Sequence, residues 1–189
     1  MRDVTSVLTE EHRLILRMID LVEHNTRLVE EGGFSDWDFY LDAVDFIRHY
    51  ADRFHHAKEE DVLFRELVRN GMPEQNSPVA AMLMAHDQGR AFVRGMEEAA
   101  RRAKGGDASA PAAVAENARG YAALLRDHID KEDNILYPLA ERVLPAGWRD
   151  AMAAEYEGAE RPGIQERYQE LVERHEERAR QGRARASAA

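Results

Sequence analysis

The sequence of 189 residues contains no cysteine, so disulfide bonds, thiolate metal ligands and thiol redox chemistry are all excluded. It also lacks an apolar run long enough to span a membrane, and the first residues lack the apolar segment of a secretory signal peptide. Basic residues are in the minority, because 26 Lys and Arg stand against 36 Asp and Glu, and the formal net charge is −10. Nucleic acids and anionic membranes both favour clustered positive charge. We therefore expect a cytoplasmic protein with neither of these partners, and the sequence identifies no protein partner.

Glycine and proline are sparse, and half of them lie at the boundaries of four long helical patterns. These patterns end at Gly32-Gly33, Asn70-Gly71, Gly105-Gly106 and Pro145. No alternating pattern of useful length indicates a strand. The sequence therefore predicts an all-α fold, an antiparallel up-down four-helix bundle over residues 1–145. A C-terminal helical extension with a disordered tail is expected over residues 146–189.

Residues of metal-ligand type interrupt the apolar stripes of the predicted helices. His12 falls on the stripe of the first helix, His86 on that of the third, and His128 and Glu132 on that of the fourth. A single buried histidine can be an ordinary hydrogen-bonded core residue. Several such residues on different helices are costly to bury unless they interact with one another or with a ligand. The pattern indicates a shared polar site in the bundle core.

One short element occurs twice along the chain. The segments "RFHHAKEEDVLF" at 53–64 and "RDHIDKEDNILY" at 126–137 both place a histidine four residues before a glutamate. This spacing puts the two side chains on the same face of a helix. It is found in the pairs His55/Glu59, His56/Glu60 and His128/Glu132.

The single histidines extend this repeat. His12 precedes His55 by 43 residues, and His86 precedes His128 by 42. Two helix pairs thus look like two halves of one site, with room for two metal ions. Imidazole nitrogen and carboxylate oxygen without sulfur suit iron, manganese or zinc. The Glu-x-x-His motif of ferritin-like di-iron bundles is absent, because no histidine has a glutamate three residues before it.

The sequence resembles the hemerythrin-like HHE cation-binding domains over roughly residues 5 to 145. The resemblance rests on "TEEHRLI" around His12, "HHAKEEDVLF" at 55–64, "AHDQGR" at 85–90 and "HIDKEDNILYP" at 128–138. It implies a four-helix bundle with a non-haem di-iron centre that binds or reacts with dioxygen, peroxide or nitric oxide. Two irons per chain are implied, with manganese or zinc as alternatives. The metal ligands carried over by position are His12, His55, Glu59, His86, His128 and Glu132.

Two positions depart from the pattern of the oxygen-carrying hemerythrins. Arg90 stands where these proteins have a second histidine on the third helix, and arginine cannot ligate a metal. Their last carboxylate lies five residues after the final histidine, whereas Glu132 lies four after His128; Asp133 has the other spacing and is a fallback ligand. Oxidation chemistry or non-enzymatic sensing is therefore favoured over reversible oxygen transport. The residues do not decide whether the protein is an enzyme.

The adjacent pairs at 55–60 leave an alternative open. Neighbouring residues of an α-helix point about 100° apart, so one pair should face inward and the other should be peripheral. The family spacing selects His55 and Glu59. His56 and Glu60 are less certain candidates, and His56 is either a support for the ligands or the replacement for the histidine missing at position 90.

Three residues outside the ligand set carry separate expectations. Arg90 is expected to pair with a carboxylate near the site, such as a glutamate or Asp87. Tyr121 is either a core residue or a hydrogen-bond donor to an iron-bound oxygen species. His175 is assigned to the charged C-terminal tail.

Overall fold

The computed structural model describes residues 5–145, 147–159 and 161–187. Helices account for most of them, and no strand occurs among these residues, so the predicted all-α class is confirmed. In chain order the helices are α1 (Ser6–Glu30), α2 (Trp37–Phe46), η1 (Ile47–His56), η2 (Glu59–Phe64), α3 (Arg65–Arg69), α4 (Pro78–Lys104), α5 (Ala110–Lys131), η3 (Glu132–Leu136), α6 (Tyr137–Val143), α7 (Trp148–Ala159) and α8 (Ile164–Ser187). The three η elements are π-helices.

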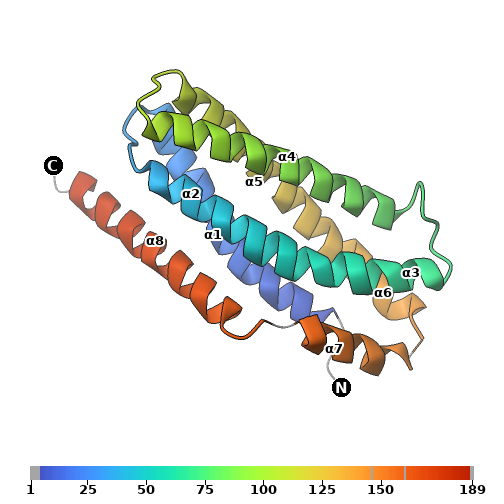
Figure 1. Ribbon diagram of the computed structural model, residues 1–189. Helices are drawn as coiled ribbons and strands as arrows, with labels where there is room; N and C mark the ends of the chain where they lie inside the picture. The colour runs from blue at the N-terminus through green and yellow to red at the C-terminus, as the bar shows by residue number, and fades with distance from the viewer. Residues whose placement is uncertain (1–4, 146, 160, 188–189) are drawn as a thin grey trace.

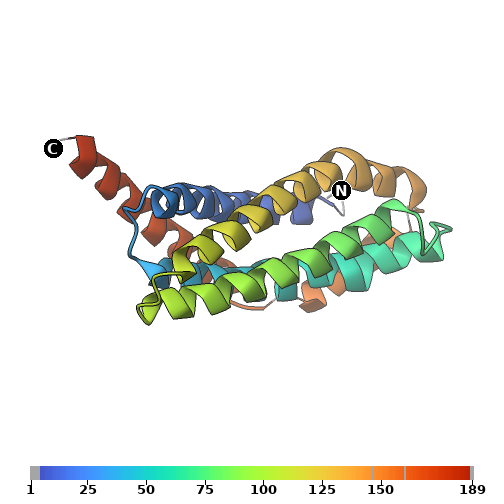
Figure 2. The same cartoon turned by 90° about the horizontal axis from the view of Figure 1, so that it is seen from above.

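Four long helical segments lie side by side and run in alternating directions (Figures 1 and 2). They are α1, the segment from α2 to α3, α4, and the segment from α5 to α6. Helix α1 packs against α5, α5 against α4, and α4 against α2, while η1 contacts both α1 and α4. The molecule is therefore a helical bundle whose interior receives side chains from all four segments.

Local sequence explains where α4 begins and ends. The Ser77 hydroxyl accepts a hydrogen bond from the Ala80 amide at 3.2 Å, and Pro78 occupies the first turn. Serine is common at the position before a helix because its hydroxyl accepts a hydrogen bond from a free backbone amide of the first turn. Proline is common in the first turn because it has no backbone amide hydrogen that would need a partner. Just beyond the end of the helix, Gly106 has φ of 90°, a conformation that glycine adopts without steric cost.

Two apolar cores lie at different levels along the bundle. One cluster includes Ile15, Phe54, Val93 and Ile129. The other includes Leu8, Val62, Met82 and Leu136. On each of the four segments a short stretch separates the members of the two clusters, and the predicted metal ligands lie in or at the edge of that stretch. The fold thus places a polar layer between two apolar ones.

The C-terminal helices pack onto the bundle. Helix α7 adds Met152 and Tyr156 to the second core, and α8 adds Tyr168, Leu171 and Val172 to the first. Helix α8 lies along the same side of the bundle as α1 and α2 (Figure 1). It continues to Ser187, although a disordered tail was expected at the end of the chain, and residues 188–189 lie outside the described part.

His175 lies in the charged C-terminal helix α8, as assigned, but it is buried. It lies seven residues after Tyr168 on the apolar face of α8, and only 3% of it is exposed. Its Nε2 lies 2.9 Å from the Asp42 carboxylate, and its ring packs edge-to-face on Phe39. Charged residues dominate the sequence of α8, so this apolar face is not evident from the composition. It becomes evident only from the packing of α8 against α2.

Lowering the pH is expected to loosen α8. Burial lowers the pKa of His175 from its usual 6.5, although Asp42 opposes the shift, so the docked helix holds a neutral imidazole. The undocked state takes up a proton more readily, so docking is favoured above about pH 6.5 and weakens as the pH falls below it. Hydrogen exchange at about pH 7.5 and about pH 5.5, corrected for intrinsic rates, should show α8 losing more protection than α4. His175→Gln should flatten this difference, and an unchanged difference would contradict the assignment.

None of the helices in the described part of the chain is both long and apolar enough to cross a membrane.

Candidate metal centre

Side chains from all four segments converge in the polar layer. The structure brings together the six predicted ligands and one further histidine, and none is more than 6% exposed. They come from α1 (His12), η1 (His55 and His56), η2 (Glu59), α4 (His86), α5 (His128) and η3 (Glu132). Burial of so many titratable groups at one level is favourable only if they satisfy one another or a shared ion.

The converging side chains form two groups of four potential metal donors. In each group one ligand atom per residue lies within 4.8 Å of all the others. The first group is His12, His55, Glu59 and Glu132, and the second is His56, Glu59, His86 and His128. Glu59 belongs to both groups, so its carboxylate lies where it could bridge two ions.

Carboxylates orient three of the histidine rings from outside. The Nδ1 atoms lie 2.9 Å from Asp133 for His12, 2.9 Å from Glu11 for His55, and 2.7 Å from Glu60 for His86. A carboxylate only accepts hydrogen bonds, so each Nδ1–H donates and the other ring nitrogen, Nε2, faces the site. This is the usual arrangement around a metal-bound histidine. Asp133 and Glu60 thus act as supports and lie outside both four-donor groups.

His56 is buried, and the expectation that one of the two neighbouring histidines is peripheral was wrong. His55 is 1% exposed and His56 is 6% exposed. Both lie in the π-helix η1, whose wider turns bring neighbouring residues closer to one face than an α-helix does. His56 stacks on His86 with ring centroids 3.7 Å apart. It belongs to the second group of potential donors, a position that a replacement for the histidine missing at position 90 would need.

Arg90 pairs with carboxylates, as predicted. Its guanidinium lies 2.7 Å from both Asp52 and Glu60 and 3.0 Å from Asp87. Asp52, His56 and Glu60 form a further group of potential ligands, but Arg90 already supplies the positive charge beside them. Burial raises the pKa of Glu60, yet hydrogen bonds from His86 and Arg90 outweigh burial and lower this pKa to about 2. Glu60 is therefore an ionised partner for both residues.

The protonation states of the potential ligands are compatible with metal binding that releases protons. Burial lowers the pKa values of His55 and His56, and positive neighbours lower them further, so both rings are neutral. Burial and the negative charge of Glu132 raise the pKa of Glu59. For His12, burial lowers the pKa, but the Asp133 and Glu132 carboxylates outweigh it and raise the pKa to about 9. A metal ion entering the first group would therefore displace protons that these residues hold without it.

The donor atoms fit a pair of divalent ions. Glu59 Oε2 and both carboxylate oxygens of Glu132 are buried without a hydrogen-bond partner. The Nε2 atoms of His86 and His128 lie 2.9 Å apart. Two nitrogens bound at right angles, each about 2.1 Å from one ion, would lie about 3 Å apart. A cation would interact with these unpartnered oxygen atoms. It would also account for the short distance between the two nitrogens.

Tyr137 belongs to the site, although it was not among the predicted site residues. Its hydroxyl donates a hydrogen bond to Glu59 Oε1 at 2.6 Å and lies 3.4 Å from Nε2 of His12. Burial and the nearby carboxylates raise its pKa, so the hydroxyl keeps its proton. Tyr137 lies five residues after Glu132, a spacing that shares a face across the π-helix η3.

Glu11 and Lys58 form a second unpredicted support. Glu11 accepts hydrogen bonds from His55 Nδ1 and, at 2.5 Å, from Lys58 Nζ. Lys58 is fully buried, and its ammonium lies 3.6 Å from the centre of the Phe54 ring. The position of Glu11, directly before His12, was the one available signal in the sequence.

Replacement of Glu11 by glutamine should weaken metal binding about 10- to 100-fold, the usual effect of losing a support for a ligand histidine. It should also lower the thermal stability, because Lys58 would lose its buried counter-charge. Equilibrium competition with a chelator measures the affinity. The neighbouring Glu10→Gln is the matched control, because Glu10 is exposed and pairs with Arg13. Equal metal affinity for the two variants would show that Glu11 does not support the site.

A family model described as the hemerythrin HHE cation binding domain matches residues 3–140. The match includes every residue of the two four-donor groups and the carboxylates that orient the histidines. No curated protein and no solved structure is similar enough to this chain to count as a match.

Proposed function

Because the chain belongs to the hemerythrin HHE cation-binding family, we propose that it is a non-haem metal protein with two iron ions in the bundle core. The two buried donor groups that share Glu59 carry this proposal. In it, His12, His55 and Glu132 hold one ion, His56, His86 and His128 hold the other, and Glu59 bridges them. Imidazole and carboxylate donors without sulfur favour iron, with manganese or zinc as alternatives.

The proposed ligand of this centre is dioxygen, peroxide or nitric oxide. A bound pair of ferrous ions supplies Lewis acidity and electrons to such a molecule. The three histidine–carboxylate contacts hold the rings in place, and the apolar cores on either side of the polar layer cover the site along the bundle axis. Tyr137 holds Glu59 in place and keeps one hydroxyl proton within 3.4 Å of a ring nitrogen of His12.

The proposal is tested on protein prepared without an affinity tag and loaded with ferrous iron under anaerobic conditions. Plasma mass spectrometry should give about two irons per chain after removal of free metal. Exposure to hydrogen peroxide or nitric oxide then separates two roles. Continued consumption of either molecule supports catalysis, whereas one stoichiometric and reversible spectral change supports a binder or sensor. Failure to retain any metal would contradict the proposal.

A further inference from the structure

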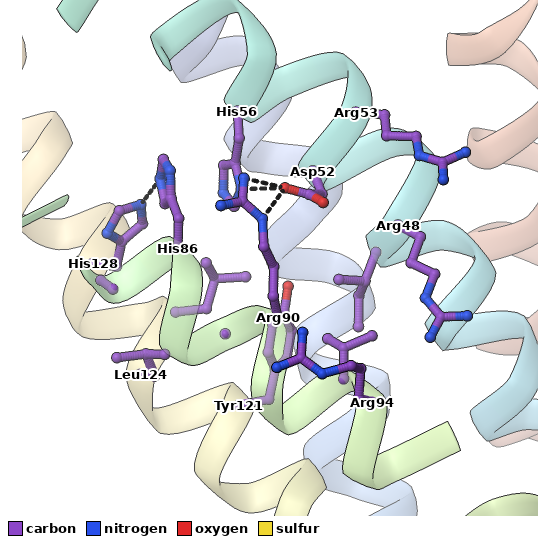
Figure 3. Close-up of a pocket in the computed structure, with 15 residues that line it drawn as sticks. Arg48, Asp52, Arg53, His56, His86, Arg90, Arg94, Tyr121, Leu124 and His128 are labelled. Atoms are coloured by element: carbon purple, nitrogen blue, oxygen red, sulfur yellow. Dashed lines mark hydrogen bonds and ion pairs between the residues drawn. The ribbon is translucent and has the colours of Figure 1, made fainter. Parts of the chain in front are cut away.

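A cavity of about 260 Å³ opens between η1, α4 and α5 and reaches the second donor group (Figure 3). His56, His86 and His128 line it on the side of the metal centre. A single water molecule needs only roughly 10–15 Å³ of such space. The cavity is therefore much larger than dioxygen, nitric oxide or hydrogen peroxide requires.

One part of the cavity wall is apolar. Ile47, Val93 and Leu125 line it together with Leu124. Gly89 also lines the cavity, and a Cβ at this position would lie in ordinary contact with the Tyr121 ring, 3.6 Å away. Sites for small organic molecules combine such apolar surface with polar groups that fix the orientation of the ligand.

Tyr121 contributes an unused hydrogen-bond donor. The residue is 2% exposed, and its hydroxyl has no hydrogen-bond partner. The side chain lies along the cavity, and its hydroxyl points toward the level of Asp52 and His56 (Figure 3). Burial raises the pKa of this hydroxyl, so it keeps a proton to donate. A buried donor without an acceptor is costly, and a ligand oxygen in the cavity would satisfy it.

The cavity rim is positive although the protein as a whole is acidic. Four arginines line the cavity together with one carboxylate, that of Asp52. Arg48 pairs with Glu97, and Arg90 neutralises Asp52 at 2.7 Å. Arg53 and Arg94 are exposed and form no ion pair within the described residues. Arg94 reaches back from α4 toward Tyr121 (Figure 3).

We propose that this cavity binds a small organic carboxylate. The carboxylate group accepts hydrogen bonds from Arg94 and from the Tyr121 hydroxyl, and the apolar body of the ligand packs against Val93 and Leu125. The far end of the ligand then points toward His86 and His128. The carboxylate would bind beside the proposed metal centre. Only the presence of the metal rests on the proposed function, because the cavity and its arginines do not require it.

The test is calorimetric titration with benzoate, using the full chain both metal-free and loaded with iron. Benzyl alcohol is the neutral probe of similar shape. Arg94→Gln removes the exposed cation that the proposal assigns to the carboxylate, and Tyr121→Phe removes the hydroxyl while it keeps the ring. Arg102→Gln is the matched control, because Arg102 lies on the same helix, pairs with Asp107 and does not line the cavity. Thermal unfolding confirms that each variant is folded.

Benzoate is expected to bind at one site per chain, with or without iron. Loss of a charge-assisted hydrogen bond should weaken it about tenfold in Arg94→Gln, and loss of the neutral one about fivefold in Tyr121→Phe. Arg102→Gln should bind benzoate like the wild type, and benzyl alcohol should bind the wild type about tenfold more weakly than benzoate does. Absence of benzoate binding, equal binding by Arg94→Gln, or equal binding of the neutral probe would overturn the proposal. Iron content is measured separately, so failure of the metal centre and failure of the carboxylate site are distinguishable.

Discussion

Replacement of Glu59 by glutamine is expected to reduce the metal content from about two ions per chain to one or none. Glu59 is the residue common to both donor groups, and its Oε2 lies 3.7 Å from Nε2 of His55 in the first group and 3.5 Å from Nε2 of His86 in the second. An amide keeps the shape of the side chain but carries no negative charge, and its nitrogen is a donor with no useful lone pair. The variant therefore loses the bridge and the charge that two divalent ions require.

The metal-free variant should fold at least as well as the metal-free wild type. Glu59 is fully buried, and burial raises its pKa, so a neutral group is favoured there in the absence of metal. Tyr137 can still donate its hydrogen bond to the amide oxygen of the glutamine. Metal content and thermal unfolding, each measured before and after iron loading, separate loss of metal from loss of fold.

Glu66→Gln is the control for this experiment. Glu66 lies on the same helical segment, is 1% exposed and pairs with Arg65 and Arg69 outside both donor groups. The control should lose some stability because its buried ion pairs are weakened, yet it should retain about two ions. Two ions retained by Glu59→Gln would rule out the bridging role.

Replacement of His56 by leucine is expected to remove one of the two ions. The second donor group would keep Glu59, His86 and His128, and the first group would be intact. Leucine fills the buried position beside His86 without a donor atom, so the fold should survive. Binding of an ion at about 1,000 times its Kd stabilises a protein by about 4 kcal/mol. For a chain of this size, loss of that contribution lowers the Tm by about 10 °C.

Glu60→Gln distinguishes this assignment from the neighbouring pair His56/Glu60. Glu60 orients His86 and pairs with Arg90 but belongs to neither four-donor group. This variant should retain both ions at reduced affinity, whereas His56→Leu should lose one even at saturating metal. If the His56→Leu variant binds two ions, His56 is not a metal ligand and only supports the other ligands.

Local signals were sufficient to predict much of the fold and most of the side chains that converge in the polar layer. Ser77 with Pro78, and the glycine pairs, act within a few residues, so the helix ends follow from the sequence alone. The four-residue spacing of His55 with Glu59 and of His128 with Glu132 fixes a shared face in the same way. These predictions needed no knowledge of how the helices pack.

The π-helical turns explain what the sequence did not predict. An α-helical period separates the faces of His55 and His56 and places Tyr137 away from Glu132. In η1 and η3 the wider turn brings both pairs to the site. The supporting contacts of Glu11 and Glu60 connect helices far apart in the sequence, as does the contact between His175 and Asp42. No periodicity within a single helix encodes such contacts.

The most direct test of the two-metal centre is anomalous diffraction at the iron absorption edge from crystals of the iron-loaded protein. The account predicts two peaks on either side of the Glu59 carboxylate, one within the group containing His12 and His55 and one within the group containing His56, His86 and His128. A single peak, a peak beside Asp52 and Glu60, or no peak in the polar layer would contradict it.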